Sequence, residues 1–452
     1  MNKKWQLVLV FIIGVISVTT MGCDKDKIEW PQGLENKYYV SELDPVAGKK
    51  MIHVEGTAYE RGFAIGYEFP EETIRNCSKE YYIAVVRGML GEWIDLFTDI
   101  DPMVDFIIGG VLELTKVHKK NIPPEFMDEM KGMVDGVNYA MPDAGFKLND
   151  ILMLNLSVDV ISSLSGDFLA SLGLNMEDFS GLLPHTCQGF VATGNATADG
   201  GTIMGRHFMF PYEVFHETCL IIEYVPDNGY PFVSITPPGY VGVTAAMNNQ
   251  GIGIGQDMLM GAPTDYAQVG MGRLLLARNA VQYASSLDEA VAMFQQADIA
   301  DGNIFVIGDG KGDGAIVECN ADTIAIRYMD STYDSAEYTK TVHQEQIESK
   351  DDLVLVANHA VIPEIANTST GSEDSIMRYQ ELCGLLLNDY GNLDVSNGRD
   401  IIDFLHPPSW YYGDDIHQPV AASITLFDLT HLRLWSLYGR YSDDWVFHQL
   451  NY

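Results

Sequence analysis

Residues 186–210 read TCQGFVATGNATADGGTIMGRHFMF and contain two strand-like runs separated by a polar turn. The run CQGFVAT precedes the turn, TIMGRHFMF follows it, and Asp199-Gly200-Gly201 supply residues that tolerate a tight reversal. The pattern predicts a β-hairpin with Cys187 at the head of its first strand. A thiol at the end of a sheet can meet a substrate while the sheet behind it holds it rigid.

Further strand-like runs follow this hairpin, with a helical pattern over about residues 270–297. The runs are LIIEYV (220–225), FVSITP (232–237), VGVTAAMN (241–248), GIGIGQ (251–256), NIFVIGD and GAIVECN on either side of residue 311, and VAASITLFDLTH and LRLWSLYG over 420–439. Short turns between such runs favour antiparallel sheets covered by helices over a parallel, doubly wound sheet. We therefore expect an α+β fold.

The residues before the hairpin divide into two parts. Residues 23–50 are mostly polar and interrupted by proline and glycine, which predicts a tether. Residues 51–186 show apolar spacing of three and four, and Pro123 and Pro124 open one such run, so we expect a helical leader segment. The catalytic domain is then expected over residues 187–452.

The first 22 residues are typical of an export signal. Lys3 and Lys4 precede the apolar run LVLVFIIGVISV, which is too short to span a bilayer comfortably. Cys23 follows Gly22 and resembles the lipidated cysteine of bacterial lipoproteins, although Thr20 stands where that motif prefers leucine. We expect a lipoprotein of the bacterial cell envelope, periplasmic or surface-exposed, with an ordinary cleaved signal as the alternative.

Charge excludes several partners. The formal net charge is −36 at pH 7, and removing residues 1–22 takes away two lysines and no acid. Such an acidic body repels nucleic acid and anionic lipid headgroups, so we expect no nucleic-acid partner and membrane attachment only through Cys23.

Several catalytic motifs are absent from the sequence. It has no GxSxG elbow, no HExxH pair and no GxxxxGK[ST] loop, and no cysteine pair has CxxC spacing. We therefore expect no metal and no organic cofactor. Whether Cys77, Cys219, Cys319 and Cys383 form disulfides stays open at this stage.

Cys187 offers a different chemistry if the bond after Thr186 is cut. The freed amine would have a pKa of about 7.7–8.0 beside a thiol near about 8.5, so a proton can pass between them near neutral pH. Nucleophiles activated by their own terminal amine work in this way. The simpler alternative is a buried cysteine that only fills space.

Six segments over roughly residues 51–440 resemble, in order, the motifs of one family. They are VEGTAYERGFAIG (54–66), the hairpin at 186–210, YVGVTAAMNNQGIGIG (240–255), LVLVANHAVIPEI (353–365), SIMRYQELCGLL (375–386) and ASITLFDLTHLRLWSLYG (422–439). This order resembles the acyl-coenzyme A:6-aminopenicillanic acid acyltransferase family of cysteine N-terminal nucleophile (Ntn) hydrolases, which includes penicillin V acylases and bile salt hydrolases. The resemblance implies a four-layer αββα sandwich, self-cleavage between Thr186 and Cys187, and two processed chains that stay associated.

The resemblance also implies roles for individual residues. Cys187 becomes the nucleophile, and Arg206 occupies the position of a cation beside it. Asn248 and Asn358 match asparagines near the oxyanion, and Arg378 matches the arginine of an SxxR helix. The implied reaction is hydrolysis, or acyl transfer, at a linear amide bond of a small N-acylated amine or amino acid.

The sequence departs from the family at one position. Where the family commonly has GRNxD, this chain has GRHFM, so Met209 replaces an acid that organises the amine of the cysteine. Asp257 or another acid could substitute. His207, in the asparagine position, could supply a base, or its side chain could face the other side of the strand.

Two other functions stay open at the level of sequence. One is a phospholipase B-like ester hydrolase on the same fold, and the other is a noncatalytic surface lipoprotein that keeps the scaffold. Two minor motifs have simpler explanations: GDGKGDG (308–314) fits a hairpin turn better than a calcium loop at Asp309 and Asp313, and WYYG (410–413) fits packing better than an acyl pocket.

Overall fold

The computed structural model describes residues 28–44, 48–83, 101–163, 187–209, 215, 218–259, 261–329, 350–403, 421–438 and 445–452. The chain divides into two units at Trp30, and the architecture below is that of the second, Pro31–Tyr452. The expected signal peptide, Cys23, Thr186 and residues 410–413 lie outside the described residues. Within the described part of the chain, no helix has both the length and the apolar character needed to cross a bilayer.

A nine-stranded sheet forms the larger layer, in the order β1-β2-β5-β6-β7-β8-β9-β10-β11. Its neighbours run antiparallel except β2 and β5, which are parallel. The strands are β1 (Tyr38–Asp44), β2 (Lys49–Gly56), β5 (Leu220–Pro226), β6 (Phe232–Thr236), β7 (Ala245–Asn248), β8 (Ile252–Met258), β9 (Asn303–Asp309), β10 (Asp313–Cys319) and β11 (Ile324–Tyr328).

A six-stranded antiparallel sheet forms the second layer, in the order β12-β3-β4-β13-β14-β15. The strands are β12 (Leu353–Val356), β3 (Gln188–Ala192), β4 (Ile203–Met209), β13 (Ala421–Asp428), β14 (Arg433–Tyr438) and β15 (Val446–Gln449). β3 and β4 are the two strands of the predicted hairpin, and they pair from Gln188–His207 to Ala192–Ile203. The strand-turn-strand prediction is confirmed.

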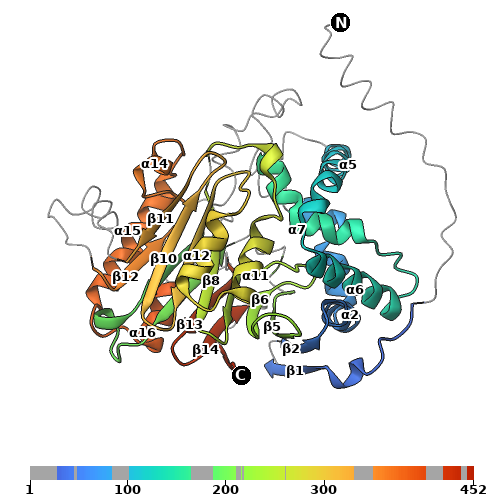
Figure 1. Cartoon of the computed structure of the whole chain (residues 1–452), viewed down its shortest axis with the longest axis horizontal. Coiled ribbons are helices and arrows are strands. Elements are labelled where there is room, and N and C mark those ends of the chain that lie inside the picture. Colours follow the sequence, from blue (N-terminus) through green and yellow to red (C-terminus); the bar gives the residue numbers. More distant parts are fainter. Residues whose placement is uncertain are drawn as a thin grey trace, which may run out of the picture. The chain divides into compact units, whose positions relative to one another are not determined.

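Helices cover the outer faces of both sheets (Figure 1). On the nine-stranded sheet, α11 (Arg273–Tyr283) contacts β7 and β8, and α12 (Leu287–Gln295) contacts β9, β10 and β11. On the six-stranded sheet, α15 (Glu373–Asn388) contacts β12, and α16 (Val395–Asp403) contacts β4 and β13. The inner faces meet where β3 contacts β9 and β10 contacts β12. The predicted four-layer αββα sandwich is confirmed.

The tether expected over residues 23–50 differs from the structure. Residues Tyr38–Asp44 are strand β1, which pairs with β2, and β2 joins β5 of the same sheet. A strand next to an existing sheet satisfies its backbone hydrogen bonds there, so a polar composition does not keep this segment extended in solvent. The expected tether therefore contributes a strand to the sheet, and the helical leader begins with a second strand, β2.

The remaining leader elements are α2 (Ala58–Glu68), α3 (Pro70–Asn76), α5 (Asp101–His118), α6 (Pro124–Ala140) and α7 (Leu148–Ser163). Thr57 caps α2 in a capping box with Glu60. α2 and α6 touch at backbone distance, because a Cβ added at Gly62 would lie 2.0 Å from the Glu129 carbonyl oxygen and one at Gly132 2.1 Å from that of Tyr59. The close approach explains the glycine in the YERG motif.

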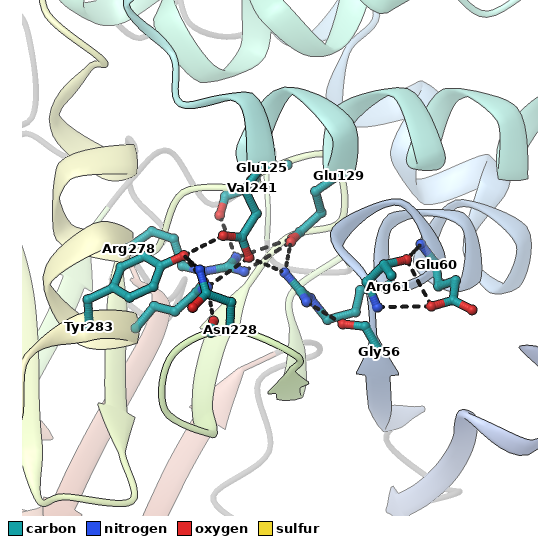
Figure 2. Close-up of polar contacts among 11 residues, drawn as sticks. Gly56, Glu60, Arg61, Glu125, Glu129, Asn228, Val241, Arg278 and Tyr283 are labelled. Atoms are coloured by element: carbon teal, nitrogen blue, oxygen red, sulfur yellow. Dashed lines mark hydrogen bonds and ion pairs between the residues drawn. The ribbon is translucent and has the colours of Figure 1, made fainter.

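A buried polar group joins this helix pair to α11, and we call it the leader cluster: Arg61, Glu125, Glu129, Arg278 and Tyr283 (Figure 2). Glu129 accepts from Arg61 at 2.9 Å and from Arg278 at 3.0 and 3.2 Å. The three side chains are at most 1% exposed. The carboxylate of Glu129 thus balances one cation from the leader and one from the predicted catalytic domain.

Candidate functional site

Cys187 lies directly before β3 and is 7% exposed. Its backbone nitrogen donates to Asn358 Oδ1 at 2.7 Å, and its carbonyl oxygen accepts from Arg378 Nη1 at 2.8 Å. Two predicted site residues therefore hold the backbone of the predicted nucleophile on both sides of its Cα. This geometry fixes the direction in which a new chain terminus at Cys187 would point.

Asn358 and Arg378 reach Cys187 from neighbouring elements. Asn358 follows β12, whose last residue pairs with Gly189 of β3, and Arg378 lies on α15. Arg378 Nη2 donates to Asn358 Oδ1 at 3.1 Å, and Arg378 Nε to Asp374 at 2.9 Å. Asn358 Nδ2 donates to the Met258 carbonyl oxygen at 2.9 Å. These contacts leave the Asn358 carboxamide little rotational freedom.

Arg206 joins the two sheets beside the cysteine. It lies on β4 and pairs with Asp257 of β8 at 2.8 Å, and both side chains are at most 1% exposed. Burial lowers the pKa of the Arg206 guanidinium, but Asp257 and Cys187, the latter also through a side-chain hydrogen bond, raise it above its usual value. A Cβ on Gly255 would lie 2.6 Å from Arg206 Cδ, so the glycine-rich strand makes room for this cation.

Asp257 is less well satisfied than Arg206. Burial raises its pKa to about 6 against the opposing charges of Arg206 and Arg378. Apart from the ion pair, its oxygens accept no hydrogen bond from any described residue. We call Cys187, Arg206, Asp257, Asn358 and Arg378 the cysteine cluster. A carboxylate in this state is suited to accept a further donor.

His207 does not face the cysteine cluster. Its Nδ1 lies 3.1 Å from the carbonyl oxygen of Ile402 on α16, because alternate side chains of β4 point to opposite faces. Burial, with the nearby charge of Arg206, lowers the pKa of His207 to about 3, so the ring is neutral. The base role considered for His207 is wrong, and the opposite orientation is correct.

Asn248 is a correction to the predicted site. It ends β7, and its Nδ2 donates to the carbonyl oxygens of Val281 and Ala284 at 2.8 Å, while its Oδ1 accepts from two backbone amides of the following turn. The turn leads into the start of β8, whereas Asp257 and Met258 are at its other end. At about 3.3 Å per residue the two ends are roughly 20 Å apart. Asn248 fastens a hairpin to α11 and is not near Cys187.

The minor motifs are structural in the described residues. The described cysteines are all buried, and no disulfide joins any two of them: Cys77, Cys187, Cys219, Cys319 and Cys383. GDGKGDG forms the β9–β10 turn, where Asp309 accepts from the Lys311 amide at 2.9 Å and Gly312 has φ 105°. Met209 ends β4.

A cavity of about 280 Å³ lies elsewhere, at the start of α11, and none of the cysteine cluster lines it. Its buried charged residues are already paired: Asp159 accepts from the backbone and side chain of Arg273 at 2.9 and 3.1 Å, and Asp301 pairs with the same arginine. We therefore place the candidate site at Cys187 and not in this cavity.

One contact at the site was missed by sequence reasoning. Asp374 precedes Arg378 by one helical turn and fixes its guanidinium. The i, i+4 spacing of an acid and an arginine on a predicted helix was the available signal.

An αββα sandwich with a cysteine held by its backbone nitrogen at the head of an inner strand defines the class of Ntn hydrolases. A sequence profile of the acyl-coenzyme A:6-aminopenicillanic acid acyl-transferase family matches residues 200–392. An uncharacterized protein of Archaeoglobus fulgidus is 42% identical over 443 residues, which are 95% of this chain and 68% of that protein. The chain belongs to this family of amide hydrolases and acyltransferases.

Two further matches are more distant. Protein dcd1A of Dictyostelium discoideum is 23% identical over 404 residues, covering 82% of this chain and 84% of that protein. The solved structure of a Caenorhabditis elegans N-acylethanolamine-hydrolyzing acid amidase ortholog has 14% identity and a TM-score of 0.39, covering 54% of this chain and 93% of the other.

Proposed function

We propose that this protein is a self-processing cysteine amidohydrolase, or acyltransferase, that cuts the Thr186–Cys187 bond and then uses Cys187 as the nucleophile. One observation carries the proposal: the nitrogen that would become the new α-amine is held by Asn358 at 2.7 Å. The partner is the side chain of Asn358, which Arg378 and the Met258 carbonyl oxygen hold in place, and not a backbone carbonyl of a neighbouring strand.

The proposed reaction follows from that orientation. When the amine of Cys187 donates one N–H to Asn358 Oδ1, its lone pair can turn toward its own thiol and accept the thiol proton. The thiolate attacks the carbonyl carbon of an N-acyl substrate, and the C–N bond breaks as the ammonium returns the proton to the leaving amine. Water, or another amine, then releases the acyl group from the thioester.

The cationic and amide groups of the cysteine cluster would stabilise the negative charge that forms on the thiolate and on the oxyanion. Arg206 favours the thiolate because an adjacent cation lowers the cost of the anionic form. Asn358 has two N–H groups, of which one donates to Met258, and we assign the other to the oxyanion. Arg378 fixes Asn358 and the Cys187 carbonyl, so we assign it a positioning role.

Asp257 is the acid that we assign to the ammonium in place of Met209. It is buried beside Arg206, and its oxygens have room in their hydrogen bonding for a new donor. Self-cleavage creates such a donor at Cys187. The acid would thus come from β8 of the opposite sheet and not from β4.

We further propose that the chain is exported, carries a lipid at Cys23, and acts on a small N-acylated amine or amino acid. The two products of self-cleavage would stay together, since β2 pairs with β5 over six register positions and the leader cluster spans both parts. Neither phospholipase B-like activity nor a purely binding role has a specific observation in its favour.

The experiment is intact-mass analysis of the purified protein together with turnover of a panel of N-acyl amino acids. A fragment beginning at Cys187 and amide turnover are expected, and Cys187→Ala should abolish both, with at least about a 10⁴-fold loss of kcat. Cys219→Ala, which replaces another buried cysteine that forms no disulfide, is the matched control and should be cut and active. An uncut wild-type chain that hydrolyses amides fully would contradict the proposal, and an uncut, inactive chain would favour the binding role.

A further inference from the structure

Glu318 lies on β10 of the nine-stranded sheet, and its side chain is fully buried. Its carboxylate accepts from the backbone amide of Val361 at 2.9 and 3.1 Å and from that of Ile362 at 2.9 Å. These amides belong to the connection that follows β12 of the six-stranded sheet and contains Asn358. The carboxylate therefore reaches from one sheet to the loop of the other.

Arg327 of β11 completes this contact. Its Nη2 lies 3.3 Å from Glu318 Oε1 and donates to the Leu355 carbonyl oxygen of β12 at 3.0 Å. Both members of the pair are 0% exposed. A buried carboxylate needs a cation and hydrogen-bond donors to offset its desolvation, and here the donors are the loop amides themselves.

The position of this pair relative to Asn358 gives it a consequence for the reaction. The anchored amides are three and four residues after Asn358, and the anchored carbonyl of Leu355 is three residues before it. The loop is thus fixed on both sides of the asparagine that holds the Cys187 nitrogen. Near the same site, the ion pair of Arg206 and Asp257 joins β4 of one sheet to β8 of the other.

We propose that Glu318 is a positioning residue for the nucleophile: with Arg327 it sets the height of the Asn358 loop over the sheet, and through Asn358 the direction of the Cys187 amine. This inference rests on the function proposed above. A misplacement of about 1 Å at a reacting group can lower the rate about 10²-fold. Loss of the contacts that Glu318 makes with the loop should therefore lower kcat more than it changes KM.

The test uses Glu318→Gln in the full chain. A glutamine keeps the shape, but its NH₂ group would face either a backbone N–H or the Arg327 guanidinium, which are all donors. We expect the Val361 and Ile362 amides to lose hydrogen-exchange protection, self-cleavage to slow, and kcat per folded molecule to fall about 10- to 100-fold with KM little changed.

The matched control is Glu129→Gln, another fully buried glutamate paired with arginine but remote from Asn358. It should lower thermal stability without changing kcat per folded molecule. Glu318→Asp, which keeps the charge for Arg327 but shortens the reach to the loop, covers the case in which Glu318→Gln does not fold, and should also lower kcat.

The outcomes separate the two proposals. If both amides keep their hydrogen-exchange protection in the folded Glu318 variants, Glu318 does not hold the loop. If protection is lost but kcat and self-cleavage are unchanged, the loop contact does not position Cys187. If the wild-type chain neither cuts itself nor turns over amides, the proposed function fails, while the exchange measurement still decides whether Glu318 holds the loop.

Discussion

The leader cluster and the cysteine cluster are both buried groups of arginines and acids, but their acids are satisfied to different degrees. In the leader cluster (Figure 2), Glu129 accepts three hydrogen bonds from two arginines. Burial raises the pKa of Glu125, but hydrogen bonds from Tyr283, Gln282 and Arg61 lower it below its usual value. In the cysteine cluster, the pKa of Asp257 is raised to about 6 and its oxygens accept no further bond among the described residues.

The difference separates a structural cluster from a reactive one. When the charges of a cluster satisfy one another's hydrogen bonds, the cluster stabilises the folded state but has no hydrogen-bonding capacity left for a substrate. A buried acid with too few hydrogen-bond donors destabilises the folded state. Such destabilisation is common at reactive sites, where catalysis needs a group whose pKa lies near the working pH. The five predictions below, ordered by expected effect, test that contrast.

Among these five predictions, the largest effect is expected at Glu129. Replacing Glu129 by glutamine leaves two buried arginines without their shared anion, and breaking such a pair costs about 3–5 kcal/mol of the free energy of unfolding. Chemical denaturation would measure the loss, and amide turnover per folded molecule should stay at the wild-type value. A fall in turnover with unchanged stability would mean that the leader cluster takes part in the reaction.

The next effect is expected at Asp257. Asp257→Asn removes the acid that we assign to the ammonium, so kcat/KM should fall about 10²- to 10³-fold in steady-state assays. Asp159→Asn serves as the control, because Asp159 is also buried against an arginine but lies away from Cys187. Equal losses in the two variants would remove the special role of Asp257.

The pH dependence follows from the same carboxyl group. The reaction needs ionised Asp257, so kcat/KM should rise with pH, with an apparent pKa at or below about 6, and fall about tenfold for each unit below it. Stability should change in the opposite sense. A raised carboxyl pKa favours the protonated folded state, so that contribution is present below the usual value of 3.8 and is lost as pH rises through about 6. Asp257→Asn should flatten both profiles.

A smaller effect is expected at Asn248. Asn248→Ala leaves the carbonyl oxygens of Val281 and Ala284 without their donor and should cost about 1–3 kcal/mol of stability. Turnover per folded molecule should be unchanged, whereas Asn358→Ala should lose turnover. A loss of turnover in a stable Asn248→Ala protein would restore the oxyanion role that the structure contradicts.

The smallest effect is expected at His207. The ring is neutral and faces α16, so His207→Gln should change kcat less than about threefold and leave its pH profile in place. Loss of the Ile402 contact should cost about 0.5–1.5 kcal/mol in thermal unfolding. A shifted pH profile would return His207 to the reaction.

Much of the fold could be predicted because its signals are local. Alternation of apolar residues and the turn Asp199-Gly200-Gly201 define the β3–β4 hairpin within about 25 residues of sequence. β1 was missed because none of its residues is buried, so its sequence shows no alternation of buried and exposed positions. It is held by pairing with β2 rather than by burial.

Some residues of the site were predicted correctly and others were not. Cys187, Asn358 and Arg378 come together as expected, and Asp257 stands beside Arg206 as the considered substitute for the acid missing at Met209. Asn248 was placed wrongly because a motif gives only the order of residues along the chain. Asn248 lies near the start of β8 and Cys187 near its end, and the strand separates these two points by roughly 20 Å.

The hairpin, the alternation of strands and helices and the cysteine at the head of β3 follow from sequence alone, because these features depend on neighbours in the chain. Which side chains reach that cysteine depends instead on how the two sheets pack. Arg206, Asp257 and Asn358 come from three strands or strand ends of two sheets, and their distances depend on how the sheets pack. Burial, which sets the pKa of Asp257, likewise arises only when those layers close.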